Sequence, residues 1–273
     1  MGLFGGKKEE PEDLIYQAMS LMQKNQPKAA VGLFNKALKN DPKNISALHN
    51  KGLALNQMRK YSDAITCFER ILEIDSKDAA AYNNKAIAQA ELGDTESALK
   101  NYEKAIEADP KYAAAYFNKG VLCDRLEEHE EALRTLDDAI KIDSKKPNAK
   151  FYKGIVLGKL GRHEEALNCF ENVCREHPRH MDSLFHKGIE LAELERHEQA
   201  IKIFDKLLAK HKDNANIIYA KARSLAVLDH VAESMDLLKT AVRKDPKTIR
   251  KWAKTEKAFE RFEDDEQFKK IVR

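Results

Sequence analysis

Apolar residues recur along the chain at spacings of three and four, in paired segments that short polar turns separate. From Ala113 to Lys146, one helical stretch carries Tyr116, Val121, Leu122 and Leu126. A second stretch carries Ala132, Leu133, Leu136, Ala139, Ile140 and Ile142. This spacing places apolar side chains on one face of a helix. There is no sustained run of alternating β-branched residues, so the pattern predicts an all-α chain of helix pairs.

The same pattern returns at a fixed step of 34 residues, without a gap, from Pro11 to Thr248. A fixed period of this size is typical of a stacked repeat array. The chain is therefore divided into a flexible tail (1–10), seven units and a C-terminal capping helix with its tail (249–273). The units are predicted at 11–44, 45–78, 79–112, 113–146, 147–180, 181–214 and 215–248.

Four positions of the repeat are restricted in size. The eighth residue is always small: Ala18, Gly52, Ala86, Gly120, Gly154, Gly188 and Ala222. The twentieth is Ala, or Ser in the last copy, and the twenty-seventh is apolar. The twenty-fourth is large: Phe34, Phe68, Tyr102, Leu136, Phe170, Phe204 and Leu238. Small residues let two helices approach closely, and we expect the large residue to fill the gap between layers.

Turn residues mark both ends of the second helix. The turn before it centres on Asn25, Gly93, Gly161 or Asp229, which tolerate a left-handed backbone. Three copies place Arg59, Glu127 and Glu195 there, so the sequence predicts a turn but leaves its type open. Asp-Pro at 41–42, 109–110 and 245–246 is expected to end the helix, because proline cannot continue it.

These positions together resemble the tetratricopeptide repeat family, over about nine-tenths of the chain. The fourth position lacks the family's Trp, and the seventh is Lys in six copies: Lys51, Lys85, Lys119, Lys153, Lys187 and Lys221. We expect each lysine to cover apolar surface with its stem and to keep its ammonium group in water. The resemblance implies a right-handed α-α superhelix of antiparallel hairpins and a non-catalytic scaffold for protein–protein interaction, with a groove lined by the first helices.

The positions that the resemblance places in this groove predict a peptide site. The sixth position offers Asn50, Asn84 and Asn118, whose amides both donate and accept hydrogen bonds and could hold a peptide backbone. Aromatic residues further along could form pockets for side chains. The predicted groove residues are His49, Asn50, Asn83, Asn84, Phe117, Asn118, Arg125, Phe151, Tyr152, Phe185, His186 and Tyr219. The sequence leaves open whether the ligand is extended or helical.

Composition narrows the alternatives. The net charge of +3 is too small to indicate a polyanionic partner. Single-stranded nucleic acid could use Arg125, Phe151, Tyr152, Lys159 and Arg223, but interleaved acidic residues oppose it. Self-association through the end copies is a further alternative. The four cysteines form no disulfide framework and no apolar run is long enough to span a membrane, so a cytoplasmic location is expected.

Candidate catalytic and metal-binding groups do not assemble. His129, His163 and His197 occupy the same position in successive copies, which places them about one helix-pair layer apart and out of reach of one metal ion. A second candidate metal site contains Cys174, His177, His180 and His186. No second cysteine pair supports a zinc site there. No phosphate-binding glycine loop is present. We therefore expect no cofactor, no metal and no enzyme activity.

The two ends depart from the repeat. Gly2 is reminiscent of an acylation signal, but Gly6 stands where Ser or Thr is expected. We expect a disordered leader; the alternative is a membrane or partner contact through Leu3 and Phe4. At the other end, Ile249 opens an eighth first helix, yet Glu256 occupies the small-residue position. We expect Trp252 to seal the last interface and residues 249–273 to cap the array.

Overall fold

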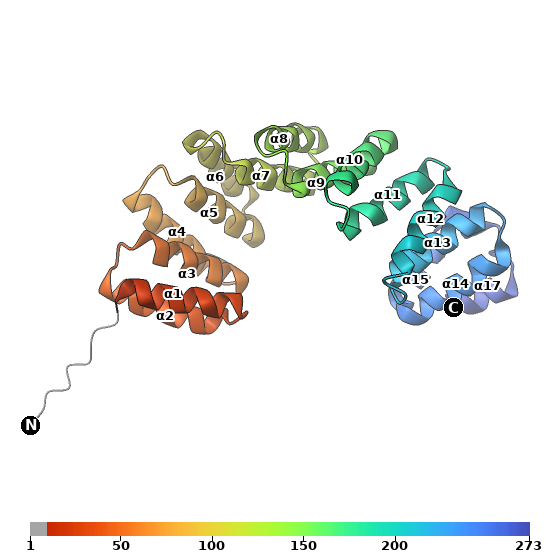
Figure 1. Ribbon diagram of the computed structural model, residues 1–273, viewed down its shortest axis with the longest axis horizontal. Coiled ribbons are helices and arrows are strands. Elements are labelled where there is room, and N and C mark those ends of the chain that lie inside the picture. The colour runs from red at the N-terminus through yellow and green to blue at the C-terminus, as the bar shows by residue number, and fades with distance from the viewer. Residues whose placement is uncertain (1–9) are drawn as a thin grey trace, which may run out of the picture. The chain divides into compact units, whose positions relative to one another are not determined.

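The computed structural model describes residues 10–273 as two compact units, residues 10–144 and residues 145–273. We call them the N-terminal unit and the C-terminal unit. The described part contains seventeen helices and no strand, so the predicted all-α fold is confirmed (Figure 1). The predicted contact through Leu3 and Phe4 lies outside the described residues. No helix within residues 10–273 combines the length and apolar character needed to cross a bilayer.

The N-terminal unit contains four antiparallel hairpins. Its helices are α1 (Pro11–Gln23), α2 (Pro27–Asn40), α3 (Ile45–Gln57), α4 (Tyr61–Ile74), α5 (Ala79–Leu92), α6 (Thr95–Ala108), α7 (Ala113–Arg125) and α8 (His129–Ile142). Each helix packs on the next along the chain, and the first helices α1, α3, α5 and α7 also touch in sequence. One face of the unit is therefore formed by first helices.

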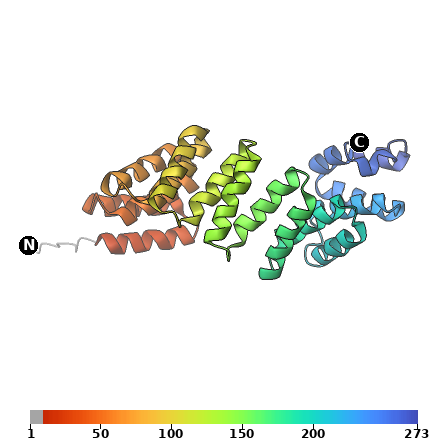
Figure 2. The same cartoon turned by 90° about the horizontal axis from the view of Figure 1, so that it is seen from above.

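The C-terminal unit contains three hairpins and a closing segment. Its helices are α9 (Pro147–Lys159), α10 (His163–Glu176), α11 (Met181–Glu193), α12 (His197–Leu208), α13 (Ala215–Val227), α14 (Val231–Lys244), α15 (Pro246–Ala253), α16 (Lys257–Glu260) and α17 (Glu266–Val272). The first helices α9, α11, α13 and α15 touch in order. Figure 2 shows the hairpins of each unit stacked side by side.

The turn inside every hairpin is left-handed at its centre. Gly93 and Gly161 have φ of 85° and 72°, and the five other central residues have φ between 57° and 66°. Arg59, Glu127 and Glu195 therefore adopt a conformation that costs about 1–2 kcal/mol for a residue with a Cβ. In return, the next backbone N–H caps the first helix, as where Lys60 N donates to Leu55 O at 2.8 Å. The geometry needed to reverse the chain overrides the residue's own preference.

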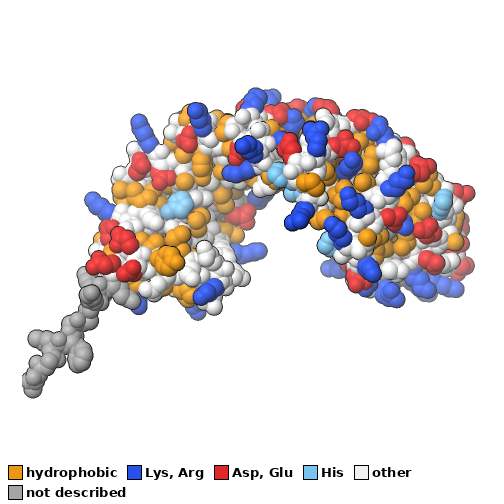
Figure 3. Space-filling model, in the orientation of Figure 1, with side chains coloured by type: hydrophobic (Ala, Val, Ile, Leu, Met, Phe, Trp, Pro, Cys, Tyr) orange, Lys and Arg blue, Asp and Glu red, His pale blue; other side chains and the backbone are white. Residues whose placement is uncertain are grey.

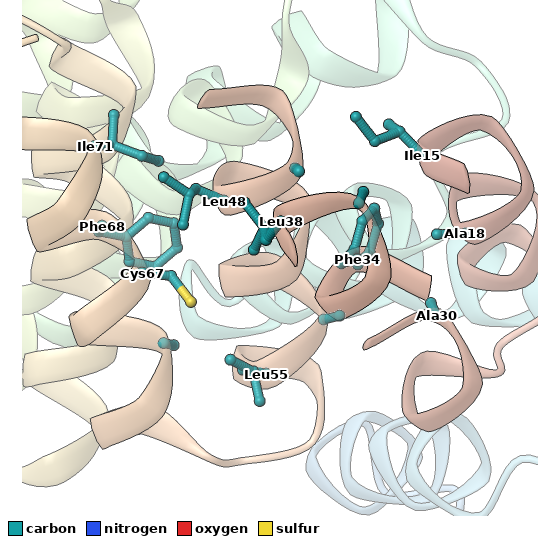
Figure 4. Packing of buried hydrophobic residues seen from close by; sticks show 14 of the residues in the cluster. Ile15, Ala18, Ala30, Phe34, Leu38, Leu48, Leu55, Cys67, Phe68 and Ile71 are labelled. Carbon is teal, nitrogen blue, oxygen red and sulfur yellow. The ribbon is translucent and has the colours of Figure 1, made fainter. Parts of the chain in front are cut away.

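The core of each hairpin is a small residue facing a large one. A Cβ added at Gly52 would lie 2.6 Å from the ring of Phe68, and one at Gly154 would lie 2.7 Å from the ring of Phe170. Both rings are completely buried. Figure 4 shows the same arrangement in the first hairpin, where Ala18 and Ala30 lie beside Phe34. The ring thus occupies space that the missing side chain leaves between the two helices of its own hairpin.

The lysines at the seventh position link neighbouring hairpins. Four of them form an ion pair with an acidic residue on the second helix of the preceding hairpin: Lys85–Glu69 at 2.8 Å, Lys119–Glu103 at 3.1 Å, Lys187–Glu171 at 2.9 Å and Lys221–Asp205 at 2.9 Å. Their side chains are only 14–24% exposed. The stems of these lysines are thus largely covered, and each ammonium group also pairs with a carboxylate that is 49–54% exposed.

The closing segment differs from the predicted capping helix. Helix α15 begins at Pro246, three residues before Ile249, and Asp245 caps it by accepting a hydrogen bond from Thr248 N at 3.1 Å. The chain turns after Ala253, so the Glu256 carboxylate does not enter a close-packed contact and instead caps α16. The prediction that Trp252 seals the last interface is wrong, because Trp252 is 38% exposed and Phe259 is 1% exposed.

Replacing Gly120 by Leu should destabilise the N-terminal unit by about 1–3 kcal/mol through overpacking. A Cβ at Gly120 would already lie 2.9 Å from Leu136 Cγ. Gly32 is the matched control, because a Cβ there meets nothing within 4 Å. Gly32→Ala should stabilise the helix by about 0.5–1 kcal/mol. Thermal unfolding measures both changes, and an unaltered midpoint for Gly120→Leu would show that the small-residue contact is misassigned.

Candidate functional site

The predicted groove residues of the N-terminal unit form a chain of hydrogen bonds across α3, α5 and α7. His49 Nε2 lies 3.3 Å from Asn84 Nδ2. Asn83 Nδ2 donates to Asn84 Oδ1 at 3.4 Å, and Asn118 Nδ2 donates to Asn83 Oδ1 at 2.8 Å. Three hairpins are thus connected by side chains of their fifth and sixth positions.

These amides are largely used within the fold. Asn83 and Asn84 are only 3% and 9% exposed. Asn50 does not join the chain, because its Nδ2 donates to the carbonyl oxygen of Ser46 in the same helix at 2.9 Å. A ligand backbone would have to replace hydrogen bonds that the asparagines already make, so their role in binding stays a prediction. A buried amide that loses its partner costs about 1–3 kcal/mol, which makes this chain of residues important for stability.

The His49 side chain must be neutral to take part in this network. Burial lowers the pKa of His49, and the negative charge of Asp78 opposes this effect only in part. The Nε2 atom faces an amide NH₂ group, which can only donate, so Nε2 has to accept. The Asn84 amide cannot be reversed without cost, because its Oδ1 accepts from Asn83.

Two other predicted residues of this unit have different surroundings. Phe117 is half-buried on α7. Arg125 is exposed and pairs with Glu91 across the neighbouring hairpin, with Nη1 and Oε1 3.3 Å apart.

In the C-terminal unit, several predicted aromatic residues pack against one another. The Phe151 ring lies 5.5 Å from the His186 ring and 5.2 Å from the His180 ring, measured between centroids. His186 stacks on the buried ring of Phe170 at 5.4 Å, and its pKa is lowered by burial. Phe151, Tyr152 and His186 are half-buried. Phe151 and His186 therefore contribute mainly to the contact between α9 and α11.

Further along the same face, α11, α13 and α15 enclose a hollow of about 190 Å³. We call it the aromatic hollow; it is lined by Phe185, Ile189, Asn216, Tyr219, Ala220, Arg223 and Trp252. A second hollow of about 270 Å³ is lined by Met181, Asp182, Phe185, Leu207, His211, Asn214, Asn216 and Ile217. Phe185 and Asn216 line both hollows. Of the predicted groove residues of this unit, Phe185 and Tyr219 are the two that meet here.

The aromatic hollow combines apolar walls with a few polar groups. The Tyr219 ring lies 5.6 Å from the exposed Trp252 ring, while its hydroxyl is buried and has no hydrogen-bond partner among the described residues. Burial raises the pKa of Tyr219, and the charge of Glu256 raises it further. Arg223 is held by Glu193 at 2.7 Å and by Glu256 at 3.6 Å, so the charge beside the hollow is balanced.

Several residues of the hollow were missing from the predicted site. Ile189 and Arg223 occupy the ninth position and Asn216 the second, which are groove positions of the repeat. The sequence connects Arg223 only with nucleic-acid binding and Trp252 only with the last interface. Trp252 is exposed because helix α15 ends at Ala253 and Phe259, instead of Trp252, is buried in the core. The repeat pattern does not predict this end of the helix.

Each of the three histidines at the seventeenth position lies beside a different carboxylate. His129 pairs with Asp124 at 3.1 Å, His163 with Glu190 at 2.8 Å and His197 with Glu195 at 3.1 Å. Among the described residues, no three His, Cys, Asp or Glu side chains are grouped to hold a metal ion. His180 instead caps α11, because its Nδ1 accepts a hydrogen bond from Ser183 N at 3.2 Å. His177 Nε2 donates a hydrogen bond to the carbonyl oxygen of Lys145 at 3.0 Å.

The cysteines are unlike activated nucleophiles. All four are free thiols. Burial raises the pKa of Cys67 and of Cys174, and raises the pKa of Cys123 to about 11. A raised thiol pKa reduces the thiolate fraction at neutral pH, which is the reactive form.

Comparison with protein families gives matches to repeat families along most of the chain. Models described as tetratricopeptide repeat match residues 43–111 and 83–147. A model described as the N-terminal TPR repeats region of Psidin matches residues 123–226, and one for anaphase-promoting complex, cyclosome, subunit 3 matches residues 3–71. A search of curated proteins finds no match.

Solved structures with the same fold cover most of the chain at low identity. A tetratricopeptide repeat protein from Parabacteroides merdae is 20% identical, with a TM-score of 0.63, and covers 88% of this chain and 96% of its own. PilW, a type IV pilus biogenesis factor, is 20% identical with a TM-score of 0.67; the match covers 75% of this chain and 94% of PilW. YrrB, described as a TPR protein with an unusual peptide-binding site, is 23% identical with a TM-score of 0.58; the match covers 67% of this chain and 94% of YrrB. At these identities the likeness shows the fold alone.

Acidification should destabilise the N-terminal unit through His49. Its pKa in the folded state lies below the unfolded value of about 6.5, so the unfolded chain binds more protons as the pH falls through that value. Stability is then lost from about pH 6.5 downwards until the folded-state pKa is passed. Thermal midpoints at about pH 7.5 and pH 5.5 should differ more for the unmodified protein than for His49→Gln.

The exposed His230 provides the control for this comparison. His230→Gln should keep the full loss of stability on acidification. If His49→Gln loses as much stability as the unmodified protein, the neutral His49 is not required by the hydrogen-bond chain.

Proposed function

We propose that this chain, a member of the tetratricopeptide repeat family, is a non-catalytic scaffold that binds a peptide segment of a partner protein at the aromatic hollow of its C-terminal unit. The fold itself is that of protein-interaction scaffolds. The single observation that supports this location is an apolar hollow on the face of first helices, lined by the exposed Trp252 and by Tyr219.

The size of the two hollows favours anchor side chains over a whole small ligand. Volumes of about 190 and 270 Å³ are below the roughly 300–1,000 Å³ of sites that enclose drug-sized molecules. Buried anchors in well-packed pockets carry most of the energy of a protein interface. Two neighbouring hollows therefore suit two apolar side chains of one peptide.

Polar groups around the hollows would orient such a peptide. Asn216 is exposed and lines both hollows, so its amide is placed to donate to and accept from a peptide backbone between the two anchors. A ligand with this pattern could be extended or helical.

The alternatives raised by the sequence receive little support. Two arginines named for nucleic-acid binding, Arg125 and Arg223, are paired with Glu91 and Glu193. Phe151 packs between neighbouring rings. Self-association through the end repeats and a cytoplasmic location stay predictions.

Selection of peptides by the full chain tests the proposal. A phage-displayed library of random peptides is panned on the immobilised protein, and enriched peptides are synthesised and titrated. Because Trp252 is the chain's only tryptophan and lines the hollow, its emission should shift on binding. The enriched sequences should share two apolar residues.

A matched pair of variants locates the binding. Ile189→Asp places a charge in the aromatic hollow, whereas Val227→Asp places the same charge at an exposed position of α13 outside it. Ile189→Asp should weaken binding about tenfold or more, because an unpaired charge in an apolar site is strongly disfavoured. Val227→Asp should bind normally. Peptides that bind both variants equally and leave Trp252 emission unchanged would place the site elsewhere.

A further inference from the structure

Helices α14, α15 and α17 enclose a second kind of hollow, which is lined by four cationic side chains and by no acidic one. Its volume is about 470 Å³, and we call it the cationic hollow; it is lined by Lys239, Val242, Arg243, Pro246, Arg250, Gln267, Lys270 and Ile271. A neighbouring hollow that shares Pro246 and Arg250 is lined further by Lys247, Lys251 and Lys254. Figure 3 shows Lys and Arg side chains gathered along the lower edge of the C-terminal unit.

The four cations of this hollow lack the acidic partners that other basic residues of the unit have. Lys244 pairs with Asp213, and Arg261 pairs with Asp229. In the described part of the chain, by contrast, no carboxylate lies within ion-pair distance of Lys239, Arg243, Arg250 or Lys270. The Nε atom of Arg250 is also buried without a hydrogen-bond partner. Unpaired cations gathered at one hollow repel one another, and a bound anion would offset that repulsion.

The spacing of the basic residues places them side by side on their helices. Lys239 and Arg243 are four residues apart on α14, and Arg250 and Lys254 are four residues apart at α15. Side chains at this spacing are neighbours on a helix surface, so their positive charges add on one side. The chain's net charge of only +3 does not indicate this local cluster of positive charge.

We infer that the cationic hollow binds a phosphate monoester, carried by a phosphorylated serine or threonine of a partner protein. Four cations that converge on one hollow exceed the single charge of a carboxylate, whereas a phosphate monoester carries a charge of about −1.5 to −2 at neutral pH. Arg243 and Arg250 offer planar guanidinium groups that can bind phosphate oxygens in pairs. Val242, Pro246 and Ile271 would contact the aliphatic part of the modified residue.

A peptide fits this hollow better than a nucleic acid or a membrane surface. The phosphodiesters of a nucleic acid carry one charge each along an extended backbone, and they call for a row of separate cations. A membrane-surface helix needs a free apolar face. The apolar residues of α17, Phe268, Ile271 and Val272, are instead buried in the unit. Lys247, Lys251 and Lys254 would meet acidic residues beside the phosphorylated one.

Binding of the full chain to degenerate peptide libraries tests this inference. Three immobilised libraries are compared, identical except for a fixed central phosphoserine, serine or glutamate. The protein should be retained on the phosphoserine library about tenfold more strongly than on either of the others, because charge-assisted hydrogen bonds to the extra oxygens are lost. Free phenyl phosphate, a phosphate monoester without a peptide, should compete at high concentration.

Two double variants with the same spacing and the same change of charge provide the control. Lys239→Gln with Arg243→Gln alters the hollow at exposed positions of α14, and Lys202→Gln with Lys206→Gln alters exposed positions of α12. The α14 pair should lose about tenfold or more in retention on the phosphoserine library, and the α12 pair should retain the unmodified affinity.

Other outcomes would overturn the inference. Equal retention on the serine or glutamate library would exclude selective binding of phosphate. Equal losses in both double variants would show a general effect of net charge. Stronger binding of single-stranded RNA or of phosphatidylserine vesicles than of the phosphoserine library, lost with the α14 pair, would assign the hollow to nucleic acid or to a membrane surface.

Discussion

The close contact between a small residue on the first helix and a large residue on the second is the interaction on which the rest of the structure depends. At Gly52 and at Gly188, which occupy the eighth position, a Cβ would lie only 2.6 Å from the ring of the opposing phenylalanine. The helices of a hairpin can then meet without a void, and the buried ring contributes about 1.5–3 kcal/mol of apolar burial. Since each hairpin is small, it also needs its neighbours, and the lysine ion pairs and the asparagine chain fix how neighbours meet.

This mode of assembly separates the role of the first helices from that of the second. Packing inside a hairpin uses the eighth position of the first helix, so its fifth, sixth and ninth positions are left for the shared face. In the N-terminal unit several of the fifth and sixth positions make hydrogen bonds with one another, as between Asn83 and Asn118. In the C-terminal unit the fifth positions are aromatic, and Phe185 and Tyr219 line a hollow. We therefore place peptide binding in the C-terminal unit.

The period and the size-restricted positions were enough to predict helix pairs and their turns, because these depend on contacts within one copy. The outcome at Arg59 shows how strongly the repeat geometry acts, since a residue poorly suited to a left-handed turn adopts one. What could not be predicted depends on contacts between copies. Whether Asn84 faces a ligand or a neighbour depends on the residue one copy away, and the exposure of Trp252 depends on where Phe259 packs. The cationic hollow is formed by residues of three helices, and the small net charge of the chain does not indicate that basic residues gather there.

Hydrogen exchange of the full chain, measured with and without a peptide selected by it, tests the central claim most directly. The claim is that a face of first helices, held rigid by hairpin packing, binds a peptide at the aromatic hollow. It predicts slower exchange of backbone amides in α11, α13 and α15 when the peptide is present, with little change in α10 and α14. Protection confined to second helices, or an equal effect on every helix, would contradict it.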